Sequence, residues 1–400
     1  MRQYVVKPGD TVLRIAARYE LAKEQLMTAN PWISRQPYIK PGQIMFLPSS
    51  FRKRYMVMDG DTPESVAAAF QCEVCDLEAI NPGLSLYRFT PGKTIALPPV
   101  SGGPLVQLQG EYGPRECAED LLRLTSRYSC MTVEQIGASV LGTPIQALRL
   151  GSGNRALHVH GALHGNEWIT SPCLLRFAEQ YASAWTRGSS LLGHDVTEWF
   201  KQYTLWLVPM VNPDGVELVQ QGVSGLGSAA GQLLEWNGGR ENFRKWKANI
   251  RGVDLGDQFP AHWEQEVERR GKSGPAPQDY PGPAPLSEPE ARGLYEHTLS
   301  IQPERVISWH SQGQEIYWNY RSCEPEYSEQ WAHRLAQAAG YRAVKLSGSD
   351  AGYKDWFIQH YRKPGFTVEL GRGINPLPLE DFEDLAFETT AIMAAFMSLA

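Results

Sequence analysis

The first hundred residues carry the same segment twice, and this internal repeat constrains the fold more than any other feature of the chain. A Gly-Asp-Thr triplet at residues 9–11 returns at residues 60–62, and in both copies an Asn-Pro pair and then a Pro-Gly pair follow in the same order. The repeating unit is about fifty residues long, which is typical of small modules that recur in tandem. We therefore predict two copies of one module at the N-terminus, followed by a separate and larger domain.

Each copy has the local pattern of a small βααβ unit. A short β-like run leads to the Gly-Asp turn, and the next residue, Thr11 or Thr62, can cap a helix whose apolar residues recur at helical spacing. A second helix ends at Asn-Pro, and a Pro-Gly turn leads into a closing strand, QIMFLP in one copy and KTIALP in the other.

With the GDT triplet, the Asn-Pro helix end and the PGxxIxLP close, residues 3–48 and 54–99 resemble the LysM module. The resemblance implies binding of glycans that contain N-acetylglucosamine, such as peptidoglycan or chitin, and two copies would raise the avidity for a repeating polymer. The alternative is that both copies are packing modules whose groove binds no ligand. We expect the modules at residues 1–50 and 51–100, with a Gly- and Pro-containing linker at 101–108.

Composition narrows the class of protein and of partner. Of 400 residues, 42% are hydrophobic and 20% are charged, as in ordinary soluble globular proteins, and the formal net charge is −6. This charge gives no footprint for nucleic acid, and no apolar run approaches the roughly 18 residues that a membrane span needs. The N-terminus lacks the apolar stretch of a signal peptide, so we expect a cytoplasmic protein that acts on wall material in sporulating cells. Six scattered cysteines favour reduced thiols, and we expect Cys72 and Cys75 to be helix positions rather than zinc ligands.

From about residue 109 the pattern changes to longer elements. Four apolar runs, RALHVHGAL, TLWLVPMV, ERVISWH and GFTVEL, alternate with helical stretches. Continuous apolar strands between helices predict an α/β domain over residues 109–400, with a mostly parallel sheet covered by helices on both faces. Because ligands in such sheets bind at the carboxyl ends of the strands, polar side chains at those ends are the candidates for chemistry.

Four polar side chains lie at or just after the ends of these runs. His164 and Glu167 follow the first run and lie three residues apart, a spacing that lets both side chains converge on one ion. A zinc hydrolase needs a third ligand from His, Asp or Glu, and His310 closes the run RVISWH. Glu369 ends the run FTVE, where burial of a lone carboxylate is costly unless it works beside a metal.

The first run contains two further histidines. His158 is expected to be a core residue whose polar atoms are satisfied inside the protein. For His160, which precedes the glycine turn, a ligand role and a core role both stay open, and we do not assign it as a ligand.

With these residues in hand, the chain resembles the zinc carboxypeptidase family. The segments that carry the resemblance, in the family's order, are HGNE at 164–167, VNPDG at 211–215, GVDL at 252–255, PLSEPEA at 285–291, WHSQG at 309–313, KDW at 354–356 and VELG at 368–371. The resemblance implies a mixed sheet with helices on both faces. It also implies that His164, Glu167 and His310 bind one Zn²⁺ ion and that Glu369 takes the proton of the attacking water.

The same resemblance implies two supporting residues. Asp254 matches the carboxylate that orients the first zinc histidine. The cation that stabilises the developing oxyanion aligns with Lys247, while Arg244 and Arg251 remain alternatives.

Two positions depart from the family's exopeptidase pattern. Where the digestive enzymes have Asn-Arg, which clamps the C-terminal carboxylate of a peptide, this chain has Gly256 and Asp257. A carboxylate at this point disfavours a peptide carboxylate and favours an ammonium group. Just before Asp-Trp, at the base of the family's specificity pocket, Lys354 favours a carboxylate, and we expect Tyr353 beside it to belong to the substrate site.

A substrate that offers an amine to Asp257 and a carboxylate to Lys354 carries an amino-acid centre on its side chain, as meso-diaminopimelate does. The chain thus resembles a bacterial branch of the family, the γ-D-glutamyl-(L)-meso-diaminopimelate peptidases of the endopeptidase I type. This implies zinc-dependent hydrolysis of the γ-D-glutamyl-meso-diaminopimelate bond in peptidoglycan stem peptides, with the LysM modules on the glycan. The alternatives are a zinc carboxypeptidase acting on ordinary peptides and a non-catalytic peptidoglycan-binding protein.

Overall fold

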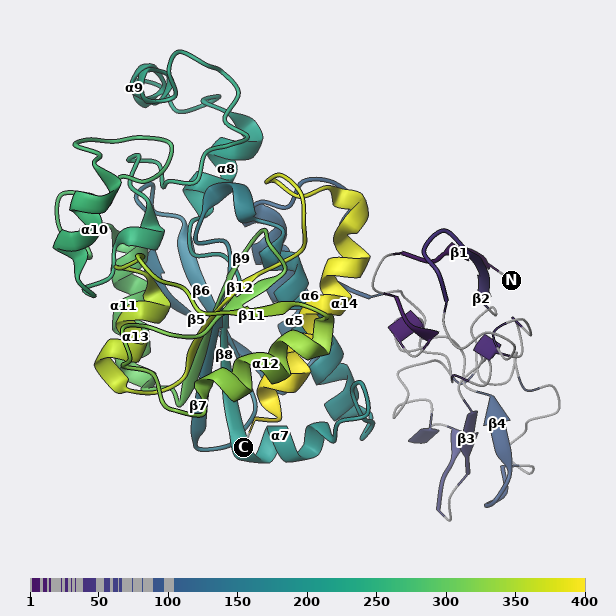
Figure 1. The fold of residues 1–400 in the computed structure, drawn as a ribbon. Coiled ribbons are helices and arrows are strands. Elements are labelled where there is room, and N and C mark those ends of the chain that lie inside the picture. The colour runs from purple at the N-terminus through teal and green to yellow at the C-terminus, as the bar shows by residue number, and fades with distance from the viewer. Residues whose placement is uncertain are drawn as a thin grey trace. The chain divides into compact units, whose positions relative to one another are not determined.

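The computed structural model describes residues 104–399 without a break and, within residues 2–96, separate short pieces, of which 39–47 and 89–96 are the longest. The chain forms two compact units, residues 1–103 and residues 104–400 (Figure 1). Among the described residues, no helix combines the length and the apolar character that crossing a bilayer requires.

The N-terminal unit contains the two strand pairs that the repeat predicts. β1 (Arg2–Val5) pairs antiparallel with β2 (Ile44–Leu47), and β3 (Arg54–Met56) pairs antiparallel with β4 (Thr94–Ala96). Each pair joins the opening run of one copy to its closing run, as a βααβ unit requires. The helices predicted between the strands fall for the most part outside the described residues, as do both cysteines of the CEVC segment.

The residues that recur in the two copies hold the modules together. In each copy a tyrosine hydroxyl donates a hydrogen bond of 2.6 Å to the aspartate of the Gly-Asp-Thr triplet, Asp10 or Asp61. Asn30, which is fully buried, donates its side-chain amide to the backbone oxygen of Phe46 and accepts the backbone N–H of the same residue, both at 2.7 Å. The Asn-Pro motif therefore ties the region where a helix was expected to end to the closing strand.

The larger unit is built on an eight-stranded mixed sheet in the order β11-β10-β12-β9-β7-β8-β6-β5. Its strands are β5 (Met131–Ala138), β6 (Pro144–Leu150), β7 (Arg155–His160), β8 (Tyr203–Val208), β9 (Arg305–His310), β10 (Glu315–Tyr317), β11 (Arg342–Val344) and β12 (Gly365–Glu369). The central strands β12, β9, β7 and β8 are parallel. β5 and β6 at one edge and β10 near the other add antiparallel pairs, while β10 and the edge strand β11 are parallel to each other, so the sheet is mixed around a parallel centre.

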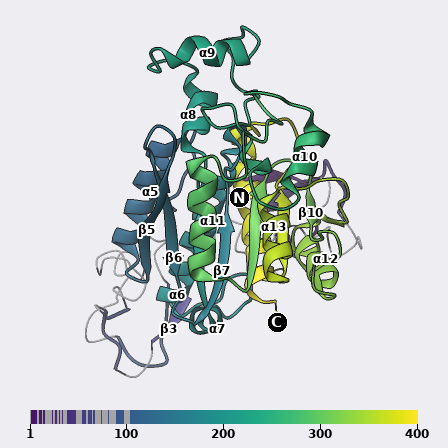
Figure 2. The same ribbon diagram turned by 90° about the vertical axis from the view of Figure 1, so that its left-hand side faces the viewer.

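Helices cover both faces of this sheet (Figures 1 and 2). α5, α6, α12 and α14 belong to one hydrophobic cluster with the sheet, and α11 and α13 belong to a second cluster. In β9, Val306 packs in the second cluster and Ile307 in the first, because successive residues of a strand point to opposite faces. The helices are α5 (Pro114–Arg127), α6 (Thr170–Thr186), α7 (Val196–Gln202), α8 (Pro213–Gln221), α9 (Ala229–Trp236), α10 (Trp263–Arg270), α11 (Pro289–Ile301), α12 (Ser328–Ala339), α13 (Tyr353–Tyr361) and α14 (Phe382–Met397).

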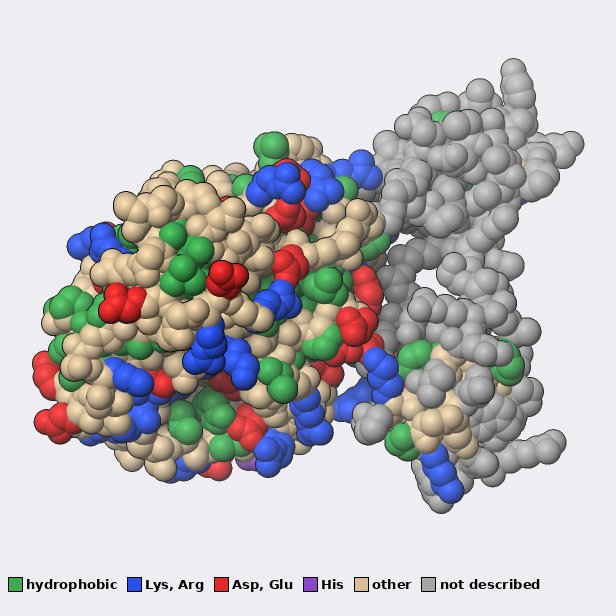
Figure 3. Space-filling model, turned by 90° about the horizontal axis from the view of Figure 1, so that it is seen from above, with side chains coloured by type: hydrophobic (Ala, Val, Ile, Leu, Met, Phe, Trp, Pro, Cys, Tyr) green, Lys and Arg blue, Asp and Glu red, His purple; other side chains and the backbone are tan. Residues whose placement is uncertain are grey.

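Charged side chains of both signs are interspersed over the face of the larger unit that Figure 3 shows. On that face, Lys and Arg side chains do not gather into a single broad patch. This mixture of signs agrees with the modest formal net charge of −6.

Candidate metal centre and active site

The three predicted metal ligands meet where two neighbouring parallel strands end. β7 ends at His160, and the chain then passes through His164 into a short 3-10 helix, Gly165–Glu167, which places Glu167 beside the strand end. β9, paired in parallel with β7, ends at His310. One ligand atom from each of His164, Glu167 and His310 lies within 4.8 Å of the others.

The atoms that face one another in this triad are those that a metal ion would use. His164 Nδ1 lies 2.9 Å from Glu167 Oε1, His310 Nδ1 lies 3.0 Å from Glu167 Oε2, and the two Nδ1 atoms are 3.3 Å apart. All three residues are buried. Burial alone would lower the pKa of His164, but the carboxylates of Glu167 and Asp254 raise that pKa to about 10. The centre therefore attracts positive charge, and its two imidazoles and one carboxylate are a typical ligand set for catalytic zinc.

Asp254 contacts the first ligand, His164, on the side of the ring that faces away from the triad, as the resemblance implies. Its Oδ1 atom lies 3.1 Å from His164 Nε2, and its two oxygens also accept the backbone N–H groups of Gly256 and Asp279. Burial would raise the pKa of Asp254, but the facing His164 holds it below its usual range. Asp254 thus stays ionised and fixes His164 with Nδ1 toward the triad.

Glu369 ends β12, and the strand register pairs it directly with His310. Burial, and next the nearby Glu167 carboxylate, raise the pKa of Glu369 to about 8. None of the described residues donates a side-chain hydrogen bond to this carboxylate. Glu369 therefore stands at the adjacent strand end with its oxygens uncommitted, as a general base requires.

Of the three cations considered for the oxyanion, only Lys247 lies at the triad. Its Nζ atom is 3.6 Å from Glu167 Oε1, and Glu167 is the main cause of a raised pKa for Lys247. Arg244 pairs with Glu111, and Arg251 lies 3.6 Å from Glu288. The geometry thus favours Lys247 among the alternatives left open by the sequence.

The predicted substrate residues are placed differently from what the sequence suggests. Asp257 is buried and is held by Arg270, whose Nη2 and Nε atoms both lie 2.8 Å from its oxygens. Lys354 is buried too, and it pairs with Asp355 and donates to the backbone oxygen of Asn319 at 2.8 Å. Both charges are already paired within the chain. The predicted direct contacts, of Asp257 with a substrate amine and of Lys354 with a substrate carboxylate, therefore need revision.

Gly256 and Tyr353 act within the protein rather than on its surface. A Cβ atom on Gly256 would come 2.8 Å from His164 Nε2, so a glycine here leaves room for the ligand ring. Tyr353 is 2% exposed, and its hydroxyl contacts His158 Nδ1 at 3.0 Å and Thr298 at 2.9 Å. The prediction that Tyr353 binds substrate is corrected, because its helix α13 turns this side chain into the core. His158 is a fully buried core residue, as predicted, but only its Nδ1 atom is satisfied: Nε2 has no hydrogen-bond partner among the described residues.

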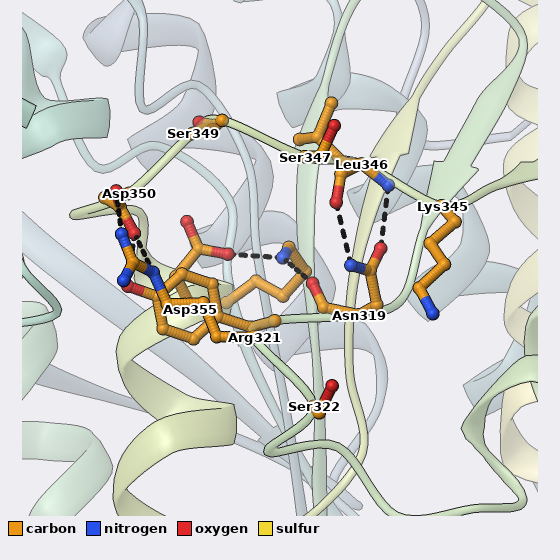
Figure 4. A pocket seen from close by; sticks show the side chains of 12 residues that line it. Asn319, Arg321, Ser322, Lys345, Leu346, Ser347, Ser349, Asp350 and Asp355 are labelled. Carbon is orange, nitrogen blue, oxygen red and sulfur yellow. Dashed lines mark hydrogen bonds and ion pairs between the residues drawn. The ribbon is translucent and has the colours of Figure 1, made fainter. Parts of the chain in front are cut away.

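A cavity of about 520 Å³ opens beside Lys354 (Figure 4). Asn319 closes one side through paired hydrogen bonds with the backbone of Leu346, at 2.7 and 2.8 Å, and Arg321 holds Asp350 with two nitrogens. Groups of both charge signs line the cavity. The full lining is Asn319, Tyr320, Arg321, Ser322, Lys345, Leu346, Ser347, Gly348, Ser349, Asp350, Lys354 and Asp355.

Comparisons with known proteins agree with this architecture. The profile of the zinc carboxypeptidase family matches residues 119–390, and that of the LysM domain matches residues 4–48 and 55–98. The chain is 41% identical over 295 residues to gamma-D-glutamyl-L-diamino acid endopeptidase 1 of Lysinibacillus sphaericus, with 74% of each chain covered. It is 38% identical over 286 residues to the uncharacterized protein YqgT of Bacillus subtilis (strain 168), with 70% of this chain and 76% of the relative covered.

Solved structures show the same fold at low sequence identity. Thrombin-activatable fibrinolysis inhibitor superposes with a TM-score of 0.60 at 20% identity, covering 74% of this chain and 76% of that one. Carboxypeptidase A from Helicoverpa armigera gives a TM-score of 0.55 at 16% identity, covering 94% and 86%. A His-Glu-His triad at the strand ends of such a fold defines a zinc metallopeptidase. The chain belongs to the zinc carboxypeptidase family, and it carries two LysM domains ahead of the catalytic unit.

The arrangement of side chains indicates how hydrolysis would proceed. When bound, zinc supplies Lewis acidity, polarising the scissile carbonyl and making water a better nucleophile. Glu369 is placed to accept the proton of the attacking water and to pass it to the leaving amine. Lys247 is placed to pair with the negative charge that develops on the carbonyl oxygen. These two roles are predictions from position.

Substitution of Lys247 tests its role. We expect Lys247→Met to lower kcat by about 10²- to 10³-fold, because a donor aimed at the developing oxyanion acts in the transition state, whereas Lys247→Arg keeps the charge and should lose far less. Steady-state kinetics with measured zinc content would check this. Arg251→Met, which removes a cation that pairs with Glu288 instead, is the matched control. A Lys247→Met enzyme with unchanged kcat would exclude the assignment.

Proposed function

We propose that this protein hydrolyses the bond between the γ-carboxyl group of D-glutamate and the L-centre of meso-diaminopimelate in peptidoglycan stem peptides. The observation that carries the proposal is the 41% identity over 295 residues to an enzyme named for γ-D-glutamyl-L-diamino acid bonds, in a chain that has the complete triad. The LysM domains support a glycan polymer as the setting of this substrate, and we propose that they bind it.

The site supports a substrate other than an ordinary peptide C-terminus. At the position of the family's carboxylate clamp the chain has Gly256 and Asp257, and the guanidinium that reaches Asp257, that of Arg270, has all three of its nitrogens engaged by acidic residues. Arg270 therefore has no nitrogen left to bind a peptide carboxylate. This argues against the alternative of a zinc carboxypeptidase acting on ordinary peptides.

The cavity beside Lys354 offers a replacement for the clamp that the sequence suggested. Lys345 lines it, is exposed, and has no carboxylate partner among the described residues; its Nζ lies 5.7 Å from the centre of the Trp318 ring. Asp350 lines the same cavity, and its charge is shared by Arg321. We propose that the side-chain amino-acid centre of diaminopimelate enters this cavity and that Lys345 pairs with its carboxylate.

Matched substrates test the proposal. The zinc-loaded full chain should cleave L-Ala-γ-D-Glu-meso-diaminopimelate, should cleave the L-lysine analogue more slowly because it lacks the side-chain carboxylate, and should leave an N-blocked peptide with an ordinary C-terminus intact. Lys345→Ala should reduce the preference for diaminopimelate over lysine. Faster cleavage of the ordinary peptide would instead favour the carboxypeptidase, and no cleavage of any substrate would favour the non-catalytic binding protein.

The LysM domains should affect binding to the peptidoglycan polymer and not the rate of hydrolysis. We expect an excess of soluble N-acetylglucosamine oligomers to release the full chain from insoluble peptidoglycan, while its rate on the soluble tripeptide stays unchanged. A sedimentation assay and a tripeptide assay under the same conditions would measure the two effects. Failure of the chain to bind peptidoglycan, or release that ignores the oligomer, would show that these modules pack without binding glycan.

A further inference from the structure

The second zinc histidine has a support of its own. His310 points Nδ1 at the other two ligands, so its Nε2 atom faces away from the metal centre. That atom lies 3.0 Å from the hydroxyl of Ser308, two residues earlier on β9. Ser308 in turn lies 2.8 Å from Nε2 of His160, its direct partner in the parallel register of β7 and β9.

Metal binding through Nδ1 fixes the direction of the hydrogen bond between His310 and Ser308 and leaves the serine proton able to point to His160. A neutral imidazole that uses Nδ1 as a metal ligand carries its proton on Nε2, so His310 donates to the Ser308 oxygen. The serine hydroxyl has one proton, which it can then donate to His160 Nε2. The pair of bonds forms a chain from His310 through Ser308 to His160.

His160 is built to remain a neutral acceptor. It is fully buried, burial and next the nearby His310 lower its pKa well below the usual value, and the ring of Tyr353 lies edge-on to it with 4.4 Å between centres. Among the described residues, its other nitrogen, Nδ1, has no hydrogen-bond partner. The polar contact that this ring makes is therefore the one with Ser308.

We propose that Ser308 and His160 are positioning residues, a neutral hydroxyl–imidazole relay that holds His310 in its metal-binding orientation and tautomer. His164 is held differently, by the ionised carboxylate of Asp254. A carboxylate that accepts the N–H of a metal-binding histidine makes that histidine a more basic metal ligand, whereas a neutral hydroxyl does so less. The asymmetry limits the negative charge around a centre that already contains Glu167 and Glu369, and so preserves the Lewis acidity of the metal.

Metal affinity tests the relay independently of activity. Ser308→Ala and His160→Phe should each weaken zinc binding by about 10- to 100-fold, measured as zinc lost to a competing chelator, because outer partners of metal ligands contribute on this scale. Ser308→Thr, which restores the hydroxyl, should recover most of the affinity. The Co²⁺-substituted variants should show a shifted visible absorption band, which a change in packing far from the metal would not produce.

A matched control separates the relay from general packing. His158 lies on the same strand, is equally buried, and contacts Tyr353 but not Ser308. His158→Phe should therefore keep wild-type zinc affinity, and the double variant Ser308→Ala/His160→Phe should lose no more affinity than either single change, because the residues act as one unit. Unchanged zinc affinity in folded Ser308→Ala would overturn the proposal, as would an equal loss in His158→Phe.

Discussion

Replacing Glu369 by glutamine should stop hydrolysis while zinc stays bound. We expect kcat to fall by about 10²- to 10⁴-fold, because a positioned general base contributes on this scale and a glutamine amide cannot accept the proton. Glu369 is not one of the three ligands, so the zinc content should stay at one ion per chain. Rates on the γ-D-glutamyl tripeptide and metal analysis of the same sample would measure both effects.

The neighbouring strand provides the control for this change. Glu315 on β10 pairs in register with Glu369, but its carboxylate bonds to Arg342 and Tyr317. Glu315→Gln removes a carboxylate from the same part of the sheet and should leave the rate within a few-fold of wild type. A Glu369→Gln enzyme that retained a tenth of the wild-type rate would show that another group carries the proton.

Replacing His310 by alanine should remove zinc and activity together. Loss of a direct ligand must cost more than the about 10- to 100-fold that loss of an outer partner costs, so the variant should be largely metal-free after dialysis. His333→Ala, an exposed histidine on α12, should bind zinc as the wild type does. Stoichiometric zinc and normal turnover in His310→Ala would contradict the triad.

The site residues that could be predicted from the sequence are either close together in the chain or located at the end of a strand. His164 and Glu167 lie within one short turn, and their spacing alone brings them together. His310 and Glu369 each end an apolar run, so their convergence follows once the central strands are parallel. The antiparallel pairs at the flanks were implied only by the family resemblance, because β5, β6, β10 and β11 are not among the apolar runs from which the parallel strands were predicted.

What the sequence could not reveal depends on which residues face each other across the fold. From the sequence, Asp257 was interpreted as a free anion, because its partner, Arg270, is supplied by a different helix. Tyr353 was predicted to be a pocket residue because it is next to Lys354 in the chain. Neighbouring residues on a helix point to different sides, and the side of Tyr353 is the core. The contact between Ser308 and His160 depends on the register of two strands that are far apart in sequence. No spacing in the sequence encodes that register.

We expect this chain to cleave one particular bond, between D-glutamate and meso-diaminopimelate. The most direct measurement is mass spectrometry of the products formed from L-Ala-γ-D-Glu-meso-diaminopimelate by the zinc-loaded full chain. We predict L-Ala-D-Glu and free meso-diaminopimelate as the products, formed neither in the presence of a chelator nor by Glu369→Gln. Intact tripeptide after incubation with the zinc-loaded protein, or release of L-alanine instead, would show that the chain does not cleave this bond.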